Sequence, residues 1–383
     1  MSEYLREEGN WLSFPFLQPV SGVLAIIAGA LFLALPCALY EPMRMNELAD
    51  RFTAATGSTF YLTAEDADGV GDYLQQQGYL ISGEEIMEVG AAGEGNMNVT
   101  LRVVTSRRHF VLKQSRPWVA KFPQLDAPVE RVLIERDFQR AIAGDRFLTG
   151  KMPELLKSDA TNYVLLLEDL GEDATDLSTI YTDGEGMSRG QLATLLEYAG
   201  KLHQFHPPGF PANTALKALN HAHVFDLPLR PDNGFPLDAI HPGLAKVAQP
   251  FQHDEKLRRV VTDLGRRYLA TGTTLIHGDF YPGSFLETDD GVYVIDAEFA
   301  HLGRPEFDIG VLMAHLLMSR ASEKRILQID TDYAKPVGFD AGLARQFCYV
   351  EIIRRIIGIA QLPLSLTLDE RGRMLDRARA GLV

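Results

Sequence analysis

The sequence predicts an α+β fold with two lobes, a small strand-rich lobe followed by a larger helical lobe. Strand-type runs occupy residues 98–104 and 109–113, and a short apolar strand occupies residues 163–167. From Ser188 onward the apolar residues mostly recur at helical spacing. A long apolar stretch precedes both parts within the first sixty residues.

Local patterns define the elements of the N-terminal lobe. Residues 64–78 begin with acidic side chains and end at a glycine, which indicates a short helix. The runs at 98–104 and 109–113 are separated by Thr-Ser-Arg-Arg, the pattern of an antiparallel hairpin. Residues 128–143 show the apolar spacing of a helix. These elements predict a small sheet with helices beside it.

Helices dominate the C-terminal lobe, and short strands interrupt them. Residues 206–250 are rich in Pro, Asn and His, so we expect irregular structure that covers one wall of this lobe. The predicted helices are 188–205, 257–270, 307–319, 339–360 and 368–380, and the predicted strands are 273–276, 284–286 and 293–295.

We divide the chain into an apolar extension at 1–60, an N-terminal nucleotide-binding lobe at 61–170 and a C-terminal catalytic and substrate-binding lobe at 171–383. Clefts between lobes are common ligand sites, so we expect the site there.

The apolar extension has three interpretations. Residues 20–40 are predominantly apolar and about long enough to span a bilayer core, which predicts a membrane anchor. The alternatives are a reading frame extended upstream of a start at Met43 or Met45, and a buried or interfacial hairpin. The leading eight residues hold one Arg and three Glu, so a secretory signal is not expected. We predict a cytoplasmic catalytic domain, with membrane contact through residues 20–40 as an alternative.

Composition excludes several classes of partner and site. The 383 residues contain 37 Lys and Arg against 51 Asp and Glu, a formal net charge of −14. This balance argues against a nucleic-acid partner. The only cysteines, Cys37 and Cys348, exclude a disulfide framework and a zinc site built on cysteine. His203, His206, His221 and His223 match no strong zinc pattern.

The run Ile276–Phe285 (IHGDFYPGSF) carries the clearest chemical signal, together with Tyr293–Glu298 (YVIDAE) after a short turn. An Asp on a tight loop can accept the proton of a substrate hydroxyl, while carboxylates on the next turn hold Mg²⁺ against phosphates. We therefore predict Asp279 as the base and Asp296 and Glu298 as the magnesium ligands. This layout indicates phosphoryl transfer.

A nucleotide-binding pattern lies upstream of this run. Gly93–Asn96 form a glycine-containing loop between predicted strands, and Lys113 ends the second strand of the hairpin. Backbone NH groups of such a loop can lie over phosphates, and a strand Lys can reach the α- and β-phosphates of ATP. Glu135 on the following helix can form an ion pair with Lys113, although a solvated helix charge is an equal alternative.

These motifs resemble the aminoglycoside phosphotransferase and choline kinase superfamily, and more narrowly the S-methyl-5-thioribose kinase (methylthioribose kinase) family. The resemblance covers about residues 64–383. Its most discriminating part is a twin-arginine motif within Glu351–Gly358. The other matching segments are Gly95–Asn98, Val111–Gln114 with Arg116–Val119, Arg131–Glu135, His277–Asp279, Gly283–Ser284, Asp296–Phe299 and Phe307–Gly310.

The resemblance implies a protein-kinase-like fold and an ATP-dependent sugar kinase that requires Mg²⁺. It implies that Arg354 and Arg355 bind the sugar, where two cations could offset charge on the transferred group. The implied nucleotide-binding residues include Gly95, Asn96, Asn98, Lys113, Glu135 and Ser284. Many members of the superfamily have a metal-binding Asn at the position of Ser284, whereas methylthioribose kinases resemble this chain in having Ser there.

Further expectations concern adenine, the catalytic loop and assembly. Adenine should lie against the connecting segment, with Glu168 and Leu170 as the positional candidates. We expect Asp308 to hold the catalytic loop by hydrogen bonds rather than to touch substrate. Members of the family are often dimers, so the resemblance admits a homodimer.

Two departures from the family concern the substrate pocket. The family's Trp-containing loop appears here as Lys121–Asp126 without Trp, and the catalytic loop reads Phe280-Tyr281-Pro282 instead of a Leu-His-Thr-like sequence. The resemblance implies phosphorylation of 5-methylthioribose on its 1-hydroxyl, in methionine salvage. The alternatives are another acceptor, such as an aminoglycoside, choline, homoserine or another sugar, and a nucleotide-binding module tethered to a membrane.

Overall fold

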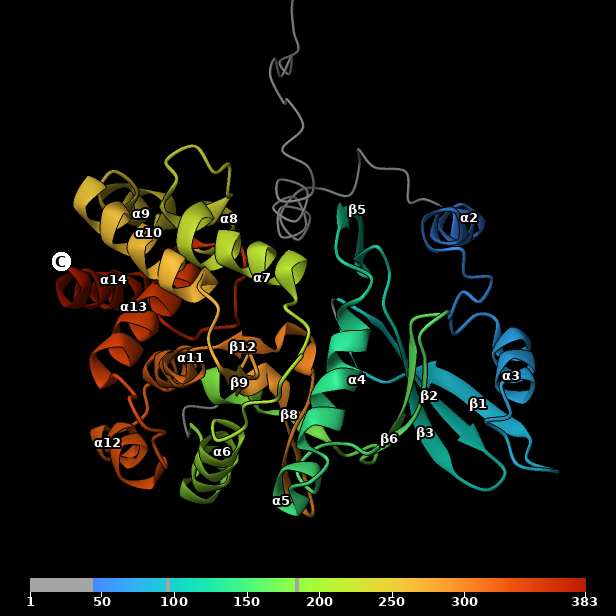
Figure 1. Cartoon of the computed structure of the whole chain (residues 1–383). Helices are drawn as coiled ribbons and strands as arrows, with labels where there is room; N and C mark the ends of the chain where they lie inside the picture. The colour runs from blue at the N-terminus through green and yellow to red at the C-terminus, as the bar shows by residue number, and fades with distance from the viewer. Residues whose placement is uncertain (1–43, 94–96, 183–185) are drawn as a thin grey trace, which may run out of the picture.

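The computed structural model describes residues 44–93, 97–182 and 186–383. The apolar segment at 20–40 and the predicted nucleotide-loop residues Gly95 and Asn96 lie outside these ranges. Figure 1 shows a strand-rich part and a helix-rich part with α4 (Arg131–Ile142) between them, which confirms the predicted two-lobed α+β fold. Across the described ranges, every helix is too short or too polar to be a candidate membrane span.

A five-stranded antiparallel sheet forms the strand-rich part, in the order β1-β2-β3-β7-β6. The predicted hairpin is confirmed as the β2–β3 pair, and the predicted strand at 163–167 is β7. The strands are β1 Ile86–Ala91, β2 Val99–Thr105, β3 His109–Gln114, β6 Leu155–Asp159 and β7 Val164–Glu168. A short hairpin of β4 Trp118–Val119 and β5 Phe122–Asp126 lies beside it.

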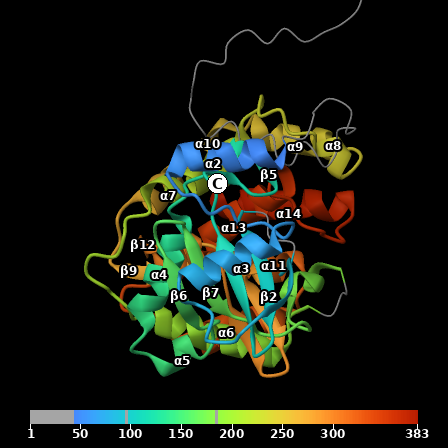
Figure 2. The same ribbon diagram turned by 90° about the vertical axis from the view of Figure 1, so that its right-hand side faces the viewer.

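Strand alternation gives this sheet two different faces. Phe110 and Leu112 pack in one core cluster with α3 (Ala67–Gln76), whereas the intervening Val111 lies against the cluster that contains Val132 of α4. Figure 2 shows α3 lying across the sheet and α2 (Met45–Thr56) above it. Because side chains alternate along a strand, Lys113 has the same facing as Val111 and is directed toward α4.

The helix-rich part contains one large apolar core and two short pieces of sheet, β11-β10-β8 and β12-β9. The helices are α5 Arg146–Thr149, α6 Arg189–Leu202, α7 Thr214–His221, α8 Leu237–Ile240, α9 Leu244–Gln252, α10 Glu255–Leu269, α11 Pro305–Met318, α12 Glu323–Asp332, α13 Ala341–Ile357 and α14 Leu368–Leu382. The strands are β8 Thr175–Asp176, β9 Thr274–Ile276, β10 Phe285–Thr288, β11 Gly291–Val294 and β12 His301–Gly303.

The prediction of irregular structure over 206–250 is wrong in part, because α7, α8 and α9 lie there. The Asn and Pro residues that suggested loops stand largely at helix ends: Asn213 precedes α7 and Pro236 precedes α8. Pro250 lies inside the last turn of α9.

Helices α11 and α13 pack against each other in the centre of the helix-rich part. Almost every residue of α11 is buried, including the charged Asp308 and the polar His315. Buried polar groups need hydrogen-bonding partners. Those partners come from the loop after β9 and from α13, where the predicted catalytic residues lie.

Candidate active site

The loop after β9 is held in shape by α11. The backbone NH groups of His277 and Gly278 donate to the Asp308 carboxylate over 2.8 and 2.9 Å, which confirms the expected role of Asp308. Gly278 has φ +81°, and a Cβ there would lie 2.3 Å from the carbonyl oxygen of Phe299. Only glycine therefore fits this position, and the loop delivers Asp279 in a fixed place.

Asp279 is a half-buried carboxylate with a cationic neighbourhood. Its backbone NH donates to Nδ1 of His277 over 3.3 Å, and Nε2 of that ring lies 3.0 Å from the carbonyl oxygen of Ile295. Burial raises the pKa of Asp279 to about 6, although the positive charges of Arg354 and Arg355 oppose the rise. The carboxylate is thus ionised at neutral pH and more basic than an exposed Asp, as a general base requires.

Lys113 connects the two parts of the molecule. Its Nζ lies 2.6 Å from Oε2 of Glu135 on α4 and also forms an ion pair with Asp296. Burial acts to lower the pKa of Lys113, but the charges of Asp296, Glu135 and Glu298 outweigh this effect and raise it. Lys113 therefore stays protonated, and the expected Lys113–Glu135 pair is present.

Asp296 and Glu298 follow β11, yet their side chains differ in access. Asp296 has a left-handed backbone (φ 61°, ψ 47°), which is uncommon for a residue other than glycine, and its side chain is 48% exposed. The Glu298 side chain is only 4% exposed. Nδ2 of Asn98 donates to it over 2.7 Å. Asp296 is thus the more accessible carboxylate for a ligand.

Arg131 is buried and forms several hydrogen bonds, although the sequence motif Arg131–Glu135 indicated no role for it. Its Nε donates to Oδ1 of Asn98 over 2.9 Å and lies 3.5 Å from Oε2 of Glu298. Its Nη groups donate to the carbonyl oxygens of Met97, Arg116, Trp118 and Pro128. Both ends of the Asn98 amide are therefore occupied, so in this structure Asn98 positions Glu298.

Ser284 is buried at the end of a 3₁₀ turn, Pro282–Ser284. Its backbone NH donates to the carbonyl of Tyr281 over 2.8 Å, and its own carbonyl accepts from the NH of Ile295 over 2.9 Å. This pairing places Ser284 beside the chain segment that leads into Asp296.

The connecting segment lies at the end of β7. The Glu168 backbone NH is already bonded to the carbonyl of Glu154 over 2.9 Å. Its carboxylate accepts from the NH of Glu154 over 3.0 Å. Asp169 is bound by Arg102, whereas no hydrogen bond among the described residues uses the NH of Leu170. Of the two predicted positions, Leu170 therefore has the backbone donor available to a ligand.

The twin arginines lie at the C-terminal end of α13 and share one carboxylate. Nε of Arg355 donates to Oε1 of Glu351 over 2.6 Å, and Nη1 of Arg354 lies 3.1 and 3.2 Å from the two oxygens. Burial acts to raise the pKa of Glu351, but the two guanidinium groups outweigh it and lower that pKa. The site thus contains two cations and one compensating anion.

Sequence reasoning missed a buried chain of polar groups behind Glu351. Nε2 of His315 on α11 lies 3.2 Å from Oε1 of Glu351, and the Tyr181 hydroxyl bonds to Nδ1 of the same ring. Burial lowers the pKa of His315 to about 4, so the ring is neutral and can donate to the carboxylate while accepting from Tyr181. The sequence did contain one indication of this polar chain: His315 lies seven residues after Asp308, so both side chains lie on the same face of the helix.

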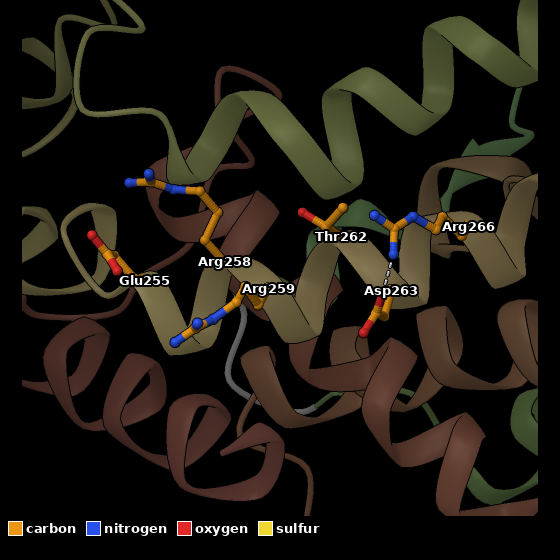
Figure 3. Close-up of a pocket in the computed structure, with 6 residues that line it drawn as sticks. All are labelled: Glu255, Arg258, Arg259, Thr262, Asp263 and Arg266. Carbon is orange, nitrogen blue, oxygen red and sulfur yellow. Dashed lines mark hydrogen bonds and ion pairs between the residues drawn. The ribbon is translucent and has the colours of Figure 1, made fainter.

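A hollow of about 490 Å³ on the outer side of α10 is separate from these groups. Figure 3 shows its lining side chains spread along α10, with Arg266 paired to Asp263. None of the lining residues is a predicted site residue; they are Glu255, Arg258, Arg259, Thr262, Asp263 and Arg266. The candidate site remains the convergence of the Asp279 loop, Asp296, Lys113 and the end of α13.

Comparison with known families agrees with this arrangement. The model of the phosphotransferase enzyme family matches residues 91–345, about two thirds of the chain. The chain belongs to this family. The matched range contains Lys113, Asp279 and Asp296, whereas the twin arginines lie just beyond it.

Named relatives of this phosphotransferase are methylthioribose kinases. The one from Erwinia tasmaniensis is 26% identical over 283 residues, which cover 70% of this chain and 69% of that protein. The one from Geobacillus sp. (strain WCH70) is 26% identical over 351 residues, 76% of this chain and 82% of the relative. A similar solved structure is choline kinase LicA from Streptococcus pneumoniae, with 14% identity, a TM-score of 0.49, and coverage of 82% of this chain and 99% of that chain.

The family match and these relatives confirm the resemblance inferred from the motifs. They also confirm the predicted class of enzyme, an ATP-dependent phosphotransferase that acts on a hydroxyl group.

Proposed function

We propose that this phosphotransferase moves the γ-phosphate of ATP to the 1-hydroxyl of 5-methylthioribose, a step of methionine salvage. The observation that carries the proposal is the meeting of the Asp279 loop with the twin arginines: the Arg355 guanidinium lies 4.7 Å from the ring centroid of Tyr281, two residues after Asp279. A base near pKa 6 beside guanidinium groups suits a neutral sugar, because its hydroxyl must lose a proton as charge develops on the phosphoryl group.

In this proposal Asp279 orients the acceptor hydroxyl and takes its proton. Lys113, held by Glu135, binds the α- and β-phosphates of ATP. The nucleotide loop of Gly95 and Asn96, together with the segment at Glu168 and Leu170, would enclose the nucleotide. Asn98 holds the Glu298 carboxylate, and Ser284 lies beside the segment that leads into Asp296, where it is expected to take part in nucleotide binding.

The residues fit a magnesium ion. Mg²⁺ is commonly held by one or two carboxylates together with substrate phosphates and water. Asp296 offers an accessible carboxylate, and Glu298 offers a second one that Asn98 and Arg131 hold in place. When bound, the ion would neutralise charge on the transferred phosphoryl group. Asp296 would exchange part of its bond with Lys113 for the metal.

Charge separates this function from the main alternatives. Choline and aminoglycosides are cations, and the guanidinium groups of Arg354 and Arg355, of which Glu351 compensates one, would repel such an acceptor. Homoserine and another sugar are the alternative acceptors, because the catalytic loop departs from the family's usual sequence at Phe280-Tyr281-Pro282.

ADP release from Mg·ATP by the full chain tests the proposal. The acceptors are 5-methylthioribose, ribose, choline, homoserine and kanamycin, each with an acceptor-free control. We expect release that depends on 5-methylthioribose. Equal release with ribose would assign a broader sugar kinase, and release only with choline or kanamycin would refute the charge argument.

A further inference from the structure

We propose that Tyr281 selects the acceptor: its ring fixes Arg355, and its hydroxyl offers a hydrogen-bonding group to a neutral, hydroxyl-rich acceptor beside Asp279. This inference rests on the proposed sugar-kinase function and adds a residue that the phosphoryl-transfer argument did not use. Tyr281 belongs to the part of the catalytic loop that departs from the family's usual sequence.

Arg355 has little freedom to reach a ligand. Its side chain is 6% exposed, its Nε is bonded to Glu351, and Nη1 lies 3.3 Å from the carbonyl oxygen of Ala360. The Tyr281 ring covers its guanidinium, with 4.7 Å between Cζ and the ring centroid. A desolvated cation over an aromatic face is stabilised by the negative electrostatic potential of that face. Arg355 is therefore a positioning residue.

Arg354 has the opposite character. Among the described residues its Nε has no hydrogen-bond partner although that atom is buried, and only one of its Nη groups is bound to Glu351. A buried donor without a partner is costly. Nη2 of Arg354 forms no hydrogen bond among the described residues, and the side chain is 11% exposed, so Arg354 is the member of the pair that contacts the acceptor.

The Tyr281 side chain is fixed on three sides, by Arg355, His315 and Gly283. Its backbone is extended (φ −138°, ψ 166°), the conformation required before Pro282. Its ring centroid lies 5.2 Å from that of His315. On the third side lies Gly283, where a Cβ would be 2.5 Å from the Tyr281 hydroxyl oxygen. Glycine at 283 thus makes room for the ring.

No hydrogen bond between described residues uses the Tyr281 hydroxyl, although both backbone groups of this residue are bonded within the loop. Burial and the nearby Asp279 charge raise its pKa, so the phenol stays protonated and can both donate and accept. Asp279 is a hydrogen-bond acceptor, Arg354 is a charged hydrogen-bond donor, and the Tyr281 phenol can act as either. Such a set matches the several hydroxyls of a sugar.

The test compares Tyr281→Phe with Tyr281→Leu in the full chain. Phe removes only the hydroxyl and keeps the ring on Arg355, whereas Leu removes both. For the acceptor that the wild-type enzyme uses, we expect Tyr281→Phe to raise KM about tenfold, with kcat and the KM for ATP within about twofold. Tyr281→Leu should also lower kcat, because Arg355 loses its cover. Tyr349→Phe is the matched control, because Tyr349 lies on α13 with Arg355 but outside the catalytic loop. It should change neither kcat nor KM.

Deoxy analogues of the acceptor give a readout that a merely structural role would not move. The wild-type enzyme should lose about tenfold in kcat/KM with the analogue that lacks the hydroxyl bound by Tyr281, and Tyr281→Phe should lose nothing further with that analogue. An unchanged KM for Tyr281→Phe, with a neutral sugar as the substrate, overturns this inference alone. Wild-type activity with cationic acceptors only overturns both the inference and the proposed function.

Discussion

Replacing Asp279 by Asn should abolish turnover and at the same time stabilise the fold. The carboxylate is kept partly buried, and burial raises its pKa from 3.8 to about 6. A group whose folded-state pKa is raised binds protons more tightly in the native state. It therefore contributes most to stability below pH 3.8, and this contribution is lost as pH rises toward 6 and above. Asn has nearly the same shape and no charge to desolvate.

The size of the effect follows from the two pKa values of Asp279. At about 1.4 kcal/mol for each tenfold change in proton affinity, ionisation of the buried group costs about 3 kcal/mol at pH 7. We expect the Asn variant to be more stable by about this amount, which corresponds to a rise of about 4 °C in Tm for a domain of this size. The advantage should fall to about 0.5 kcal/mol at pH 4, where the wild-type carboxyl is largely protonated.

Urea unfolding at pH 4, 5, 6 and 7 measures the stability difference, and ADP release measures turnover. Asp289→Asn, in the exposed turn after β10, is the control for loss of a carboxylate and should leave both unchanged. Turnover by the Asp279→Asn variant near the wild-type rate would refute the role as base. An inactive variant whose gain in stability over the wild type is no larger at pH 7 than at pH 4 would refute the desolvation argument.

Three further predictions concern the charges around this residue. The acid limb of kcat/KM should lie near pH 6, with activity falling as Asp279 is protonated, and Glu351→Gln should move that limb to lower pH because one anion near Asp279 is lost. Lys113→Ala removes the cation that binds the ATP phosphates, so calorimetry should show loss of ATP binding. It also leaves Glu135 buried without its cation, so urea unfolding should show a loss of about 3 kcal/mol in stability. Asp308→Asn should place an amide donor against the catalytic-loop NH groups, cost about 3 kcal/mol in urea unfolding and lower kcat more than the KM for ATP.

Sequence reasoning succeeded where the signal is local. The hairpin of β2 and β3 carries β-rich residues on both sides of a polar turn, and its register follows from that turn. Helix α10 places Leu257, Val261, Leu264 and Tyr268 on one buried stripe, so its spacing alone reveals it.

Elements defined by distant partners were not predicted. Strand β1 is the edge of the sheet and is mostly exposed or half-buried, so it lacks a clear alternation and depends on its pairing with β2. The helices within 206–250 were obscured by Asn and Pro residues that stand at their ends. Composition cannot distinguish a residue that ends a helix from one that forms a loop.

The candidate site divides in the same way. The strand position of Lys113 and the helix position of Glu135 were enough to suggest their ion pair. The burial of Glu298 under Asn98 and Arg131 was not readable, because it depends on packing between segments about 200 residues apart. The bond from His315 to Glu351 likewise exists only because α11 packs against α13.

The charge balance around Asp279 explains why one arginine of the pair must be held away from it. A guanidinium free to form a direct ion pair with Asp279 would depress its pKa, as such pairs do, and leave a poor base. Glu351 compensates one of the two positive charges, and the Tyr281 ring with the Ala360 carbonyl keeps Arg355 from turning toward the Asp279 carboxylate. With Asp279 ionised, the two guanidinium groups and the two carboxylates balance, and Nη2 of Arg354 forms no hydrogen bond among the described residues. The same arrangement thus keeps Asp279 basic and leaves a cation for the acceptor.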